Sequence, residues 1–382
     1  MSVLENAHVI ADTIRPRAED IEKSRRLPND IAVMMAQAGL FRIMVPTYLG
    51  GMESTPMQAM EIIETIANAD ASAGWCVMIA STTGVTSAYL DKDVAARIFG
   101  ENDTITGGVF APMGKATFDQ GGYQLSGHWN WASGSANCHW LLGGAMVMDK
   151  GKPRLGADGV PETRQFLYPA DKASLPDTWN VTGLCGTGSG DMVVDELFIP
   201  QEYSLSLAAD KPVAEGPLYT FPVFGLLAIG IAAVSLGNAR AAIDDLKDLA
   251  RAKKSQGSSK TIGQRATSQV QLAQAEADFK SARAFLFDSV KIAYGAAQTD
   301  GEISLAMRAD VRLAATNAVR RSADITRSMY DLAGGSSVFL NSSLQRRMRD
   351  AHVATQHMMV SPQTYELIGR VGFDLDTDST FL

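Results

Sequence analysis

Three of the five tryptophans of the chain fall in one short stretch, WNWASGSANCHW, at 129–140. A turn of small residues follows Trp131 and places the hydroxyl of Ser133 beside a large aromatic surface. Two interpretations are possible: aromatic side chains that fill the core of a sheet, or a wall for a flat ring with a hydroxyl directed at its edge. Because a serine hydroxyl both donates and accepts, Ser133 could hold a ring nitrogen without carrying a mobile charge.

The five histidines of the chain form no pattern typical of a metal site, and we expect no metal. His352 and His357 lie five residues apart, about 140° around a helix, so they cannot bind one ion from a shared face. His357 follows Asp350 by seven residues, which would place both on one face of a continuous helix. From spacing alone, a structural histidine remains an alternative to a catalytic one.

The glycine-rich stretch GLCGTGSGD at 183–191 invites comparison with a nucleotide-binding loop. A dinucleotide fingerprint needs a strand before it and a helix after it, whereas the residues that follow, MVVDELFIP, predict a strand. We therefore expect a tight turn between strands, whose backbone N–H groups could meet an anion or the edge of a ring.

Composition excludes several classes of function. The chain has a formal net charge of −8, so it is not expected to present the basic face that a nucleic-acid-binding protein needs. The longest apolar run, at 221–237, is interrupted by glycine and short for a membrane span, so it predicts a buried helix and no membrane contact. The three cysteines have no CxxC spacing, and the charged N-terminal stretch does not show the pattern of a signal peptide. Both features are typical of a cytoplasmic protein.

Hydrophobic periodicity divides the chain into three domains. Residues 1–103 show helical spacing, including a helix that begins at Thr55 and Pro56 and another that begins near Asn29 and stops before Pro46. Residues 104–210 alternate in short runs that predict antiparallel strands of a small barrel or sandwich. Residues 211–382 predict a bundle of four long antiparallel helices, near 217–252, 264–297, 301–333 and 341–371.

Several motifs in this order resemble the acyl-CoA dehydrogenase superfamily across essentially the whole chain. They are AGLFRIMVPTYLGG at 38–51, GGVFAPMGKA at 107–116, SGHWNWASG at 126–134, LGNARAA at 236–242 and LQRRMRDA at 344–351. The resemblance implies a mainly α fold with a central β domain: an N-terminal helical domain, a small antiparallel β barrel and a C-terminal four-helix bundle that also mediates oligomerisation.

Within that superfamily, the stretches WNWASG, WNVTGLCGTGS and RDAHVATQH resemble the reduced-flavin-dependent monooxygenases, such as the oxygenase components of two-component 4-hydroxyphenylacetate hydroxylases. A dehydrogenase needs a carboxylate base, but Met358 stands where the family's usual glutamate lies. The alternative glutamate is also missing, because residues 216–243 contain no Asp or Glu. A methionine cannot abstract a proton. An acyl-CoA dehydrogenase with an unusual base and a flavin-binding scaffold without activity remain the alternatives.

The resemblance implies a reaction in which reduced flavin, FMNH2 or FADH2, combines with O2 to a C4a-hydroperoxyflavin that hydroxylates a small aromatic or heteroaromatic substrate. A separate NAD(P)H-dependent flavin reductase would supply the reduced flavin, and the oxygenase would be a homotetramer. Within this chain the expected catalytic residues are His357, on the C4a side, and Ser133, at N5. The expected flavin contacts are Phe110, Ala111, Trp131, Ser133, Thr187 and Ser189, with Trp129 adding ring area.

These residues have distinct expected roles. The backbone of Phe110 and Ala111 would meet the pyrimidine edge, and Thr187 and Ser189 would line the path of the ribityl chain or phosphate. A histidine with the ordinary pKa of about 6.5 can hydrogen-bond to the oxygen adduct, or take a proton from the substrate, near neutral pH. His357 is therefore expected to act by hydrogen bonding or as a base.

Overall fold

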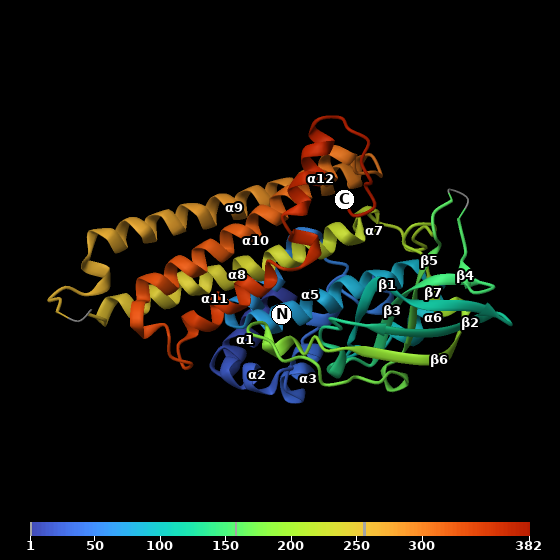
Figure 1. Ribbon diagram of the computed structural model, residues 1–382, viewed down its shortest axis with the longest axis horizontal. Coiled ribbons are helices and arrows are strands. Elements are labelled where there is room, and N and C mark those ends of the chain that lie inside the picture. The colour runs from blue at the N-terminus through green and yellow to red at the C-terminus, as the bar shows by residue number, and fades with distance from the viewer. Residues whose placement is uncertain (1, 157–158, 255–256) are drawn as a thin grey trace.

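A computed structural model describes residues 2–156, 159–254 and 257–382, and in it helices, a sheet and further helices follow one another along the chain (Figure 1). The N-terminal helices are α1 (Val3–Ile14), α2 (Ala18–Ser24), α3 (Asn29–Gln37), α4 (Pro56–Ala69), α5 (Ala71–Gly84) and α6 (Lys92–Phe99). Helix α5 is buried on nearly all of its faces. It packs against both the sheet and the C-terminal helices, so it joins the three parts of the molecule.

The start of α4 agrees with the sequence prediction, whereas the end of α3 lies earlier than Pro46 would require. Thr55 caps α4 and accepts a hydrogen bond from Gln58 N, with Pro56 in the first turn, which confirms the predicted start. Helix α3 ends at Gln37 and does not continue toward Pro46. The reason is Gly39, whose φ of 79° is left-handed and breaks the helix before a short 3₁₀ turn.

The sheet is mainly antiparallel, with one exception. Its strands are β1 (Thr106–Asp119), β2 (Gly122–Trp129), β3 (Trp140–Asp149), β4 (Lys152–Pro153), β5 (Thr163–Pro169), β6 (Met192–Pro200) and β7 (Ser204–Leu205). The hydrogen-bonded order is β6-β2-β1-β3-β5-β7, with β4 beside β3, and β1 pairs with β3 in parallel. The fully antiparallel expectation is therefore wrong for this pair. In the part of the chain that the structure describes, the pairing runs from β6 to β7 without closing into a barrel.

Trp129 fills the core of this sheet. Its side chain is fully buried among Leu125, Leu141 and other apolar residues, and its Nε1 donates to Gly144 O at 2.7 Å. The indole fits because its neighbours are glycines: a Cβ added at Gly114, Gly127 or Gly143 would lie within 3.0 Å of the ring. The expectation that Trp129 adds to a ligand wall is wrong, since the ring faces the interior of the sheet.

Replacing Trp129 by phenylalanine tests this assignment. The smaller ring leaves space between the glycines and leaves the carbonyl of Gly144 without its donor, so the free energy of unfolding should fall by about 1–3 kcal/mol. Chemical denaturation followed by circular dichroism measures the change. A variant as stable as the wild type would show that the glycine-lined slot is not filled specifically by the indole.

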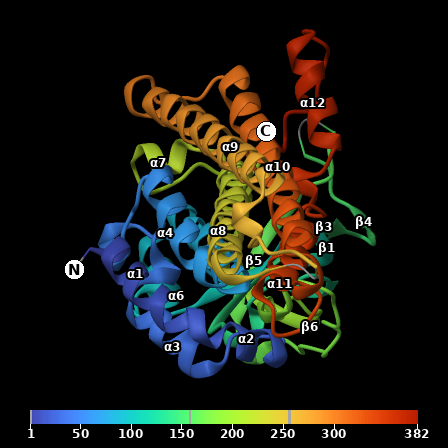
Figure 2. The same cartoon turned by 90° about the vertical axis from the view of Figure 1, so that its left-hand side faces the viewer.

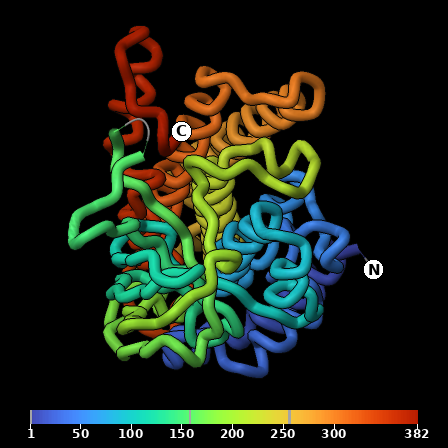
Figure 3. The backbone as a smooth tube through the Cα atoms, turned by 90° about the vertical axis from the view of Figure 1, so that its right-hand side faces the viewer, coloured from blue at the N-terminus to red at the C-terminus, as the bar shows by residue number. Residues whose placement is uncertain are grey.

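The C-terminal domain is a layer of long helices, α8 (Val223–Ala252), α9 (Ala266–Thr299) and α10 (Leu305–Ala333), preceded by the short α7 (Pro217–Thr220). Figure 2 shows α8 between the N-terminal helices on one side and α9 and α10 on the other. Figure 3 shows the path of the backbone from the opposite side. Helix α8 is long and apolar enough to cross a membrane, but 94% of its most apolar window is buried inside the protein. The predicted buried helix is therefore present.

The predicted fourth helix of the bundle is broken in two. Helix α11 (Ser343–Ala354) ends before His357, and α12 (Gln363–Gly372) begins after Pro362. A 3₁₀ turn, Met358–Val360, separates them, and the side chain of His357 caps it by accepting from Met359 N. Asp350 and His357 therefore do not share one helical face, because His357 lies beyond the end of the helix.

Candidate active site

Trp75 joins Ser133 to helix α5. Its Nε1 donates to Ser133 Oγ at 3.1 Å, and both side chains are buried. Ser133 lies in the turn after β2, where its backbone N–H contacts Trp131 O at 2.9 Å. The other ring neighbour of Trp75 is His357, whose ring centre lies 5.8 Å away at an angle of 60°. One tryptophan therefore contacts both of the residues expected to be catalytic.

The hydroxyl of Ser133 continues into a row of hydroxyls in the glycine-rich turn. Ser133 Oγ lies 2.6 Å from Ser189 Oγ, which lies 2.6 Å from Thr187 Oγ1. Thr187 Oγ1 donates to Leu184 O at 2.8 Å. Both side chains are buried, and the hydroxyl of Ser189 links that of Thr187 to that of Ser133.

The carboxyl group of Asp350 holds this turn in place. Leu184 has a left-handed φ of 50°, unusual for a branched side chain, and its N–H donates to Asp350 Oδ1 at 2.6 Å. Burial, together with the nearby carboxyl of Asp70, raises the pKa of Asp350 to about 7. The strand that follows, β6, begins at Met192, which confirms that the glycine-rich stretch precedes a strand and not a helix.

His357 is partly buried and neutral over the physiological range. Burial, and then the positive charge of Arg312, lower the pKa of His357 to about 4. Its Nδ1 accepts from Met359 N at 3.2 Å, so the proton of the neutral ring is on Nε2. In this arrangement the imidazole is a hydrogen-bond donor through Nε2, which differs from the titrating base that an ordinary pKa would allow.

Arg312 on α10 fixes the turn that carries His357. Its guanidinium donates to Met359 O at 2.7 Å and also to Phe381 O, and the side chain is almost fully buried. Burial lowers the pKa of Arg312 to about 10, so it stays charged at neutral pH. Its charge helps to keep His357 unprotonated.

The lowered pKa of His357 can be checked by titration. In the unfolded chain this histidine takes up a proton near pH 6.5, but in the folded chain only near pH 4. Its contribution to stability is therefore present above pH 6.5 and is lost as the pH falls through 4. In an NMR titration of the five histidines, we expect one midpoint near 4, for a signal that disappears in His357→Gln. A midpoint near 6.5 for that signal would contradict the assignment.

The backbone around Phe110 offers a place for the edge of a ring. The register of β1 with β3 shifts between Val109 and Gly114. Among the described residues, 110–113 of β1 are paired with neither β2 nor β3. Phe110 is partly buried and Ala111 is exposed. A bulge of this kind leaves backbone groups outside the ladder, where they can meet a polar ligand edge.

Trp131 differs sharply from Trp129. Its side chain is 69% exposed, and its φ of 63° is left-handed, which costs energy for a bulky residue. An exposed indole beside Ser133 and an unpaired bulge in β1 are features that suit a planar, hydrogen-bonding ring such as isoalloxazine. On these observations the residues present fit a flavin.

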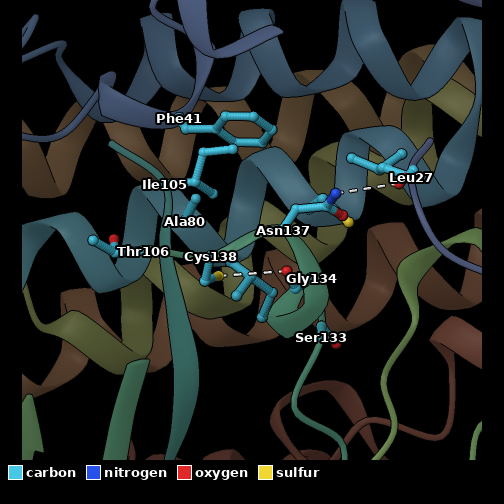
Figure 4. A pocket seen from close by; sticks show the side chains of 11 residues that line it. Leu27, Phe41, Ala80, Ile105, Thr106, Ser133, Gly134, Asn137 and Cys138 are labelled. Carbon is cyan, nitrogen blue, oxygen red and sulfur yellow. Dashed lines mark hydrogen bonds between the residues drawn. The ribbon is translucent and has the colours of Figure 1, made fainter. Parts of the chain in front are cut away.

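A small pocket beside the turn of Ser133 is mostly apolar (Figure 4). Cys76 and Cys138 both line it, and Cys138 Sγ donates to Gly134 O at 3.4 Å. Burial raises the pKa of both thiols, that of Cys138 to about 12. The thiols therefore stay protonated and serve as apolar packing that keeps water from the buried side of Ser133.

Sequence reasoning missed Trp75. It appears in the sequence as one aromatic residue in an apolar helix, ASAGWCVMIAS, and such a residue is usually part of a core. The only available signal was a hydrogen-bonding indole in a largely apolar segment, because a buried indole N–H usually has a partner.

The chain matches two domains of the acyl-CoA dehydrogenase family. They are "Acyl-CoA dehydrogenase, N-terminal domain" over residues 5–92 and "Acyl-CoA dehydrogenase, C-terminal domain" over residues 229–362. Indole-3-acetate monooxygenase of Pseudomonas putida is 31% identical over 95% of this chain and 92% of its own length. The oxygenase subunit HsaA of a flavin-dependent monooxygenase of Rhodococcus jostii is 27% identical over 99% and 100%. The chain is a flavin-dependent monooxygenase of the acyl-CoA dehydrogenase family.

Solved structures agree with this assignment. The crystal structure of 3-HSA hydroxylase from Rhodococcus sp. RHA1 superimposes on the monooxygenase with a TM-score of 0.92, at 26% identity over 100% of this chain and 99% of that one. The acyl-CoA dehydrogenase-like fold predicted from the motifs is thereby confirmed, and the cofactor of the monooxygenase is reduced flavin, with O2 as co-substrate. The roles of individual residues remain predictions.

Proposed function

We propose that this monooxygenase hydroxylates a small planar aromatic or heteroaromatic molecule, with Ser133 at N5 of the bound flavin and His357 toward C4a. Reduced flavin, when bound, would supply two electrons to activate O2, so that one oxygen atom of O2 enters the substrate and the other leaves as water. The observation that carries the proposal is the contact of Trp75 with both Ser133 and His357. It brings a hydroxyl from the sheet and an imidazole from the C-terminal domain to one place.

The protein's own contribution is to control protons and exclude water. Ser133 would hold the proton at N5, and His357 would donate from Nε2 to the oxygen that is being transferred. The buried, largely apolar helix α5 and the first half of α8 would keep water out of the site. A dry site with fixed hydrogen bonds opposes the loss of the activated oxygen as H2O2.

The substrate class is inferred from two observations. The relative of Pseudomonas putida is named for indole-3-acetate, a planar heteroaromatic acid. In this chain Phe110 and Phe224 meet edge to face at 6.3 Å, and Phe224 meets Phe381 at 5.1 Å, so an aromatic row leads from the bulge of β1 across α8. Such a row suits a flat apolar ligand.

Acyl-CoA dehydrogenation is less well supported. The residue at the family's base position, Met358, is 60% exposed and carries no titratable group. The buried carboxyl of Asp350 is already engaged in the glycine-rich turn, where its Oδ1 accepts from Leu184 N. Neither residue offers the carboxylate that takes a proton next to a thioester.

We further propose a separate NAD(P)H-dependent flavin reductase as partner, and a homotetramer that assembles through the C-terminal helices. Apolar side chains on the outer surface of α9 support this interface, since Val270, Phe285 and Ile292 are all exposed in the single chain. Light scattering of the purified protein should give the mass of four chains; a monomer would contradict the proposal.

One experiment separates the proposed activity from its alternative. FMN or FAD is reduced without air, mixed with the protein and an aromatic acid such as indole-3-acetate, and then exposed to O2. Up to one hydroxylated product per reduced flavin is expected. The proposal is wrong if none of a panel of aromatic compounds is hydroxylated and if, in the absence of air, an acyl-CoA instead reduces the bound oxidised flavin and removes its visible absorbance.

A further inference from the structure

The hydroxyls next to Ser133 form a chain whose direction is fixed at one end. Thr187 Oγ1 lies 2.8 Å from Leu184 O, and because a carbonyl oxygen can only accept, Thr187 must donate there. A hydroxyl has a single proton, so Thr187 has none left for its other contact. The 2.6 Å hydrogen bond between Thr187 and Ser189 is therefore donated by Ser189.

The same reasoning continues to Ser133. Because the proton of Ser189 is engaged by Thr187, Ser133 donates in the 2.6 Å contact between the two serine hydroxyls. The indole N–H of Trp75 can only donate, so Ser133 accepts from it at 3.1 Å. After these two bonds Ser133 has one lone pair and no proton to offer to a ligand.

We infer that this chain makes Ser133 an acceptor only, and that the monooxygenase thereby selects reduced over oxidised flavin. The inference rests on the proposed place of Ser133 at N5. The N5 of reduced flavin carries a hydrogen, whereas the N5 of oxidised flavin carries only a lone pair. A hydroxyl that can only accept forms a hydrogen bond with the N5–H of reduced flavin. With oxidised flavin, the lone pair of the same hydroxyl faces the lone pair of N5, and no hydrogen bond forms. Thr187 and Ser189 are then positioning residues that act through Ser133, instead of contacts to the ribityl chain.

The expected size of the effect follows from the number of hydrogen bonds at stake. To donate to oxidised flavin, Ser133 must give up its bond to Ser189, or the whole chain must reverse and break the bond from Thr187 to Leu184. One such bond corresponds to roughly 3- to 10-fold in affinity. Since a tenfold change in a two-electron equilibrium is about 30 mV, the midpoint potential of bound flavin should change by about 15 to 30 mV.

The test compares Thr187→Val and Ser189→Ala with the wild type, using FMN and FAD as probes. Either variant frees the proton of Ser133, so the ratio of the Kd for oxidised flavin to the Kd for reduced flavin should fall roughly 3- to 10-fold. Thr187→Ser keeps the hydroxyl and should keep the ratio. Trp75→Phe removes only a donor to Ser133, so the direction of the chain, and with it the ratio, should also persist. Anaerobic titration and the midpoint potential of the bound flavin are the readouts.

An unchanged ratio in both Thr187→Val and Ser189→Ala, with reduced flavin still bound, would overturn the inference. Equal weakening of both redox forms would overturn it as well, because a merely structural role predicts that result. If the wild type hydroxylates an aromatic compound but the ratio of the two Kd values is the same in the variants as in the wild type, only this inference fails. A wild type that binds neither form contradicts the proposed function too. The two variants change different residues, so misfolding of one leaves the other as the test.

Discussion

Replacing His357 by alanine is expected to lower the hydroxylation yield per reduced flavin by roughly 100-fold or more, with H2O2 released instead. The variant removes the Nε2–H donor that the hydrogen bond from Met359 N to Nδ1 leaves available. Binding of reduced flavin should persist, because Ser133, Trp131 and the bulge of β1 are untouched. Single-turnover mixing with O2, followed by product analysis and a peroxide assay, measures the yield.

Two further variants make this result interpretable. His352→Ala changes an exposed histidine at the end of the neighbouring helix and should retain the wild-type yield. His357→Gln keeps an N–H donor but cannot titrate near neutral pH, so it should recover part of the activity that His357→Ala loses. A glutamine variant as inactive as the alanine variant would contradict the donor role and favour a base. Coupled turnover in His357→Ala equal to that of the wild type would remove His357 from the mechanism.

Replacing Ser133 by alanine should raise the rate of H2O2 release without substrate by roughly 10- to 100-fold. The variant removes the acceptor proposed for the proton at N5, and it leaves Trp75 Nε1 and Ser189 without their partner. A hydrogen bond to a charged or polarised group is worth more than an ordinary one, and the expected range follows from that value.

Ser135→Ala is the matched control for this change. It alters the same turn, two residues later, and leaves the hydroxyl at position 133 in place, so H2O2 release should remain at the wild-type rate. The thermal midpoint of both variants shows whether the turn has kept its fold. If Ser133→Ala releases H2O2 no faster than the wild type, Ser133 does not protect the bound oxygen.

Local sequence patterns predicted the parts of this fold that local interactions determine. The cap at Thr55 and the burial of α8 follow from nearby residues and from composition, and both were predicted correctly. The parallel pairing of β1 with β3 was not predictable in this way, because it joins strands separated by another strand. The break after α11 depends on the capping side chain of His357 and on Arg312, which lies 45 residues earlier in the chain.

The site was predictable to a similar extent. The high aromatic content of the stretch around Ser133 indicated a site, but the sequence could not show which of its tryptophans lies in the core of the sheet. The pleat of β2 and the three glycines around Trp129 decide that question, and they lie on three different strands. The roles of Trp75 and Ser189 depend on contacts with Ser133 over more than fifty residues of sequence, so they became visible only in the folded chain.

The contrast between Trp129 and Trp131 gives the molecule two optical reporters. An indole that faces water, like that of Trp131, emits at longer wavelengths, and a nearby flavin that absorbs in this range would quench it by energy transfer. Trp129 is enclosed by apolar side chains and glycines and would emit at shorter wavelengths until the sheet opens. Flavin binding would therefore lower the long-wavelength emission to which Trp131 contributes, and unfolding of the sheet would shift the short-wavelength emission to which Trp129 contributes, with no attached dye.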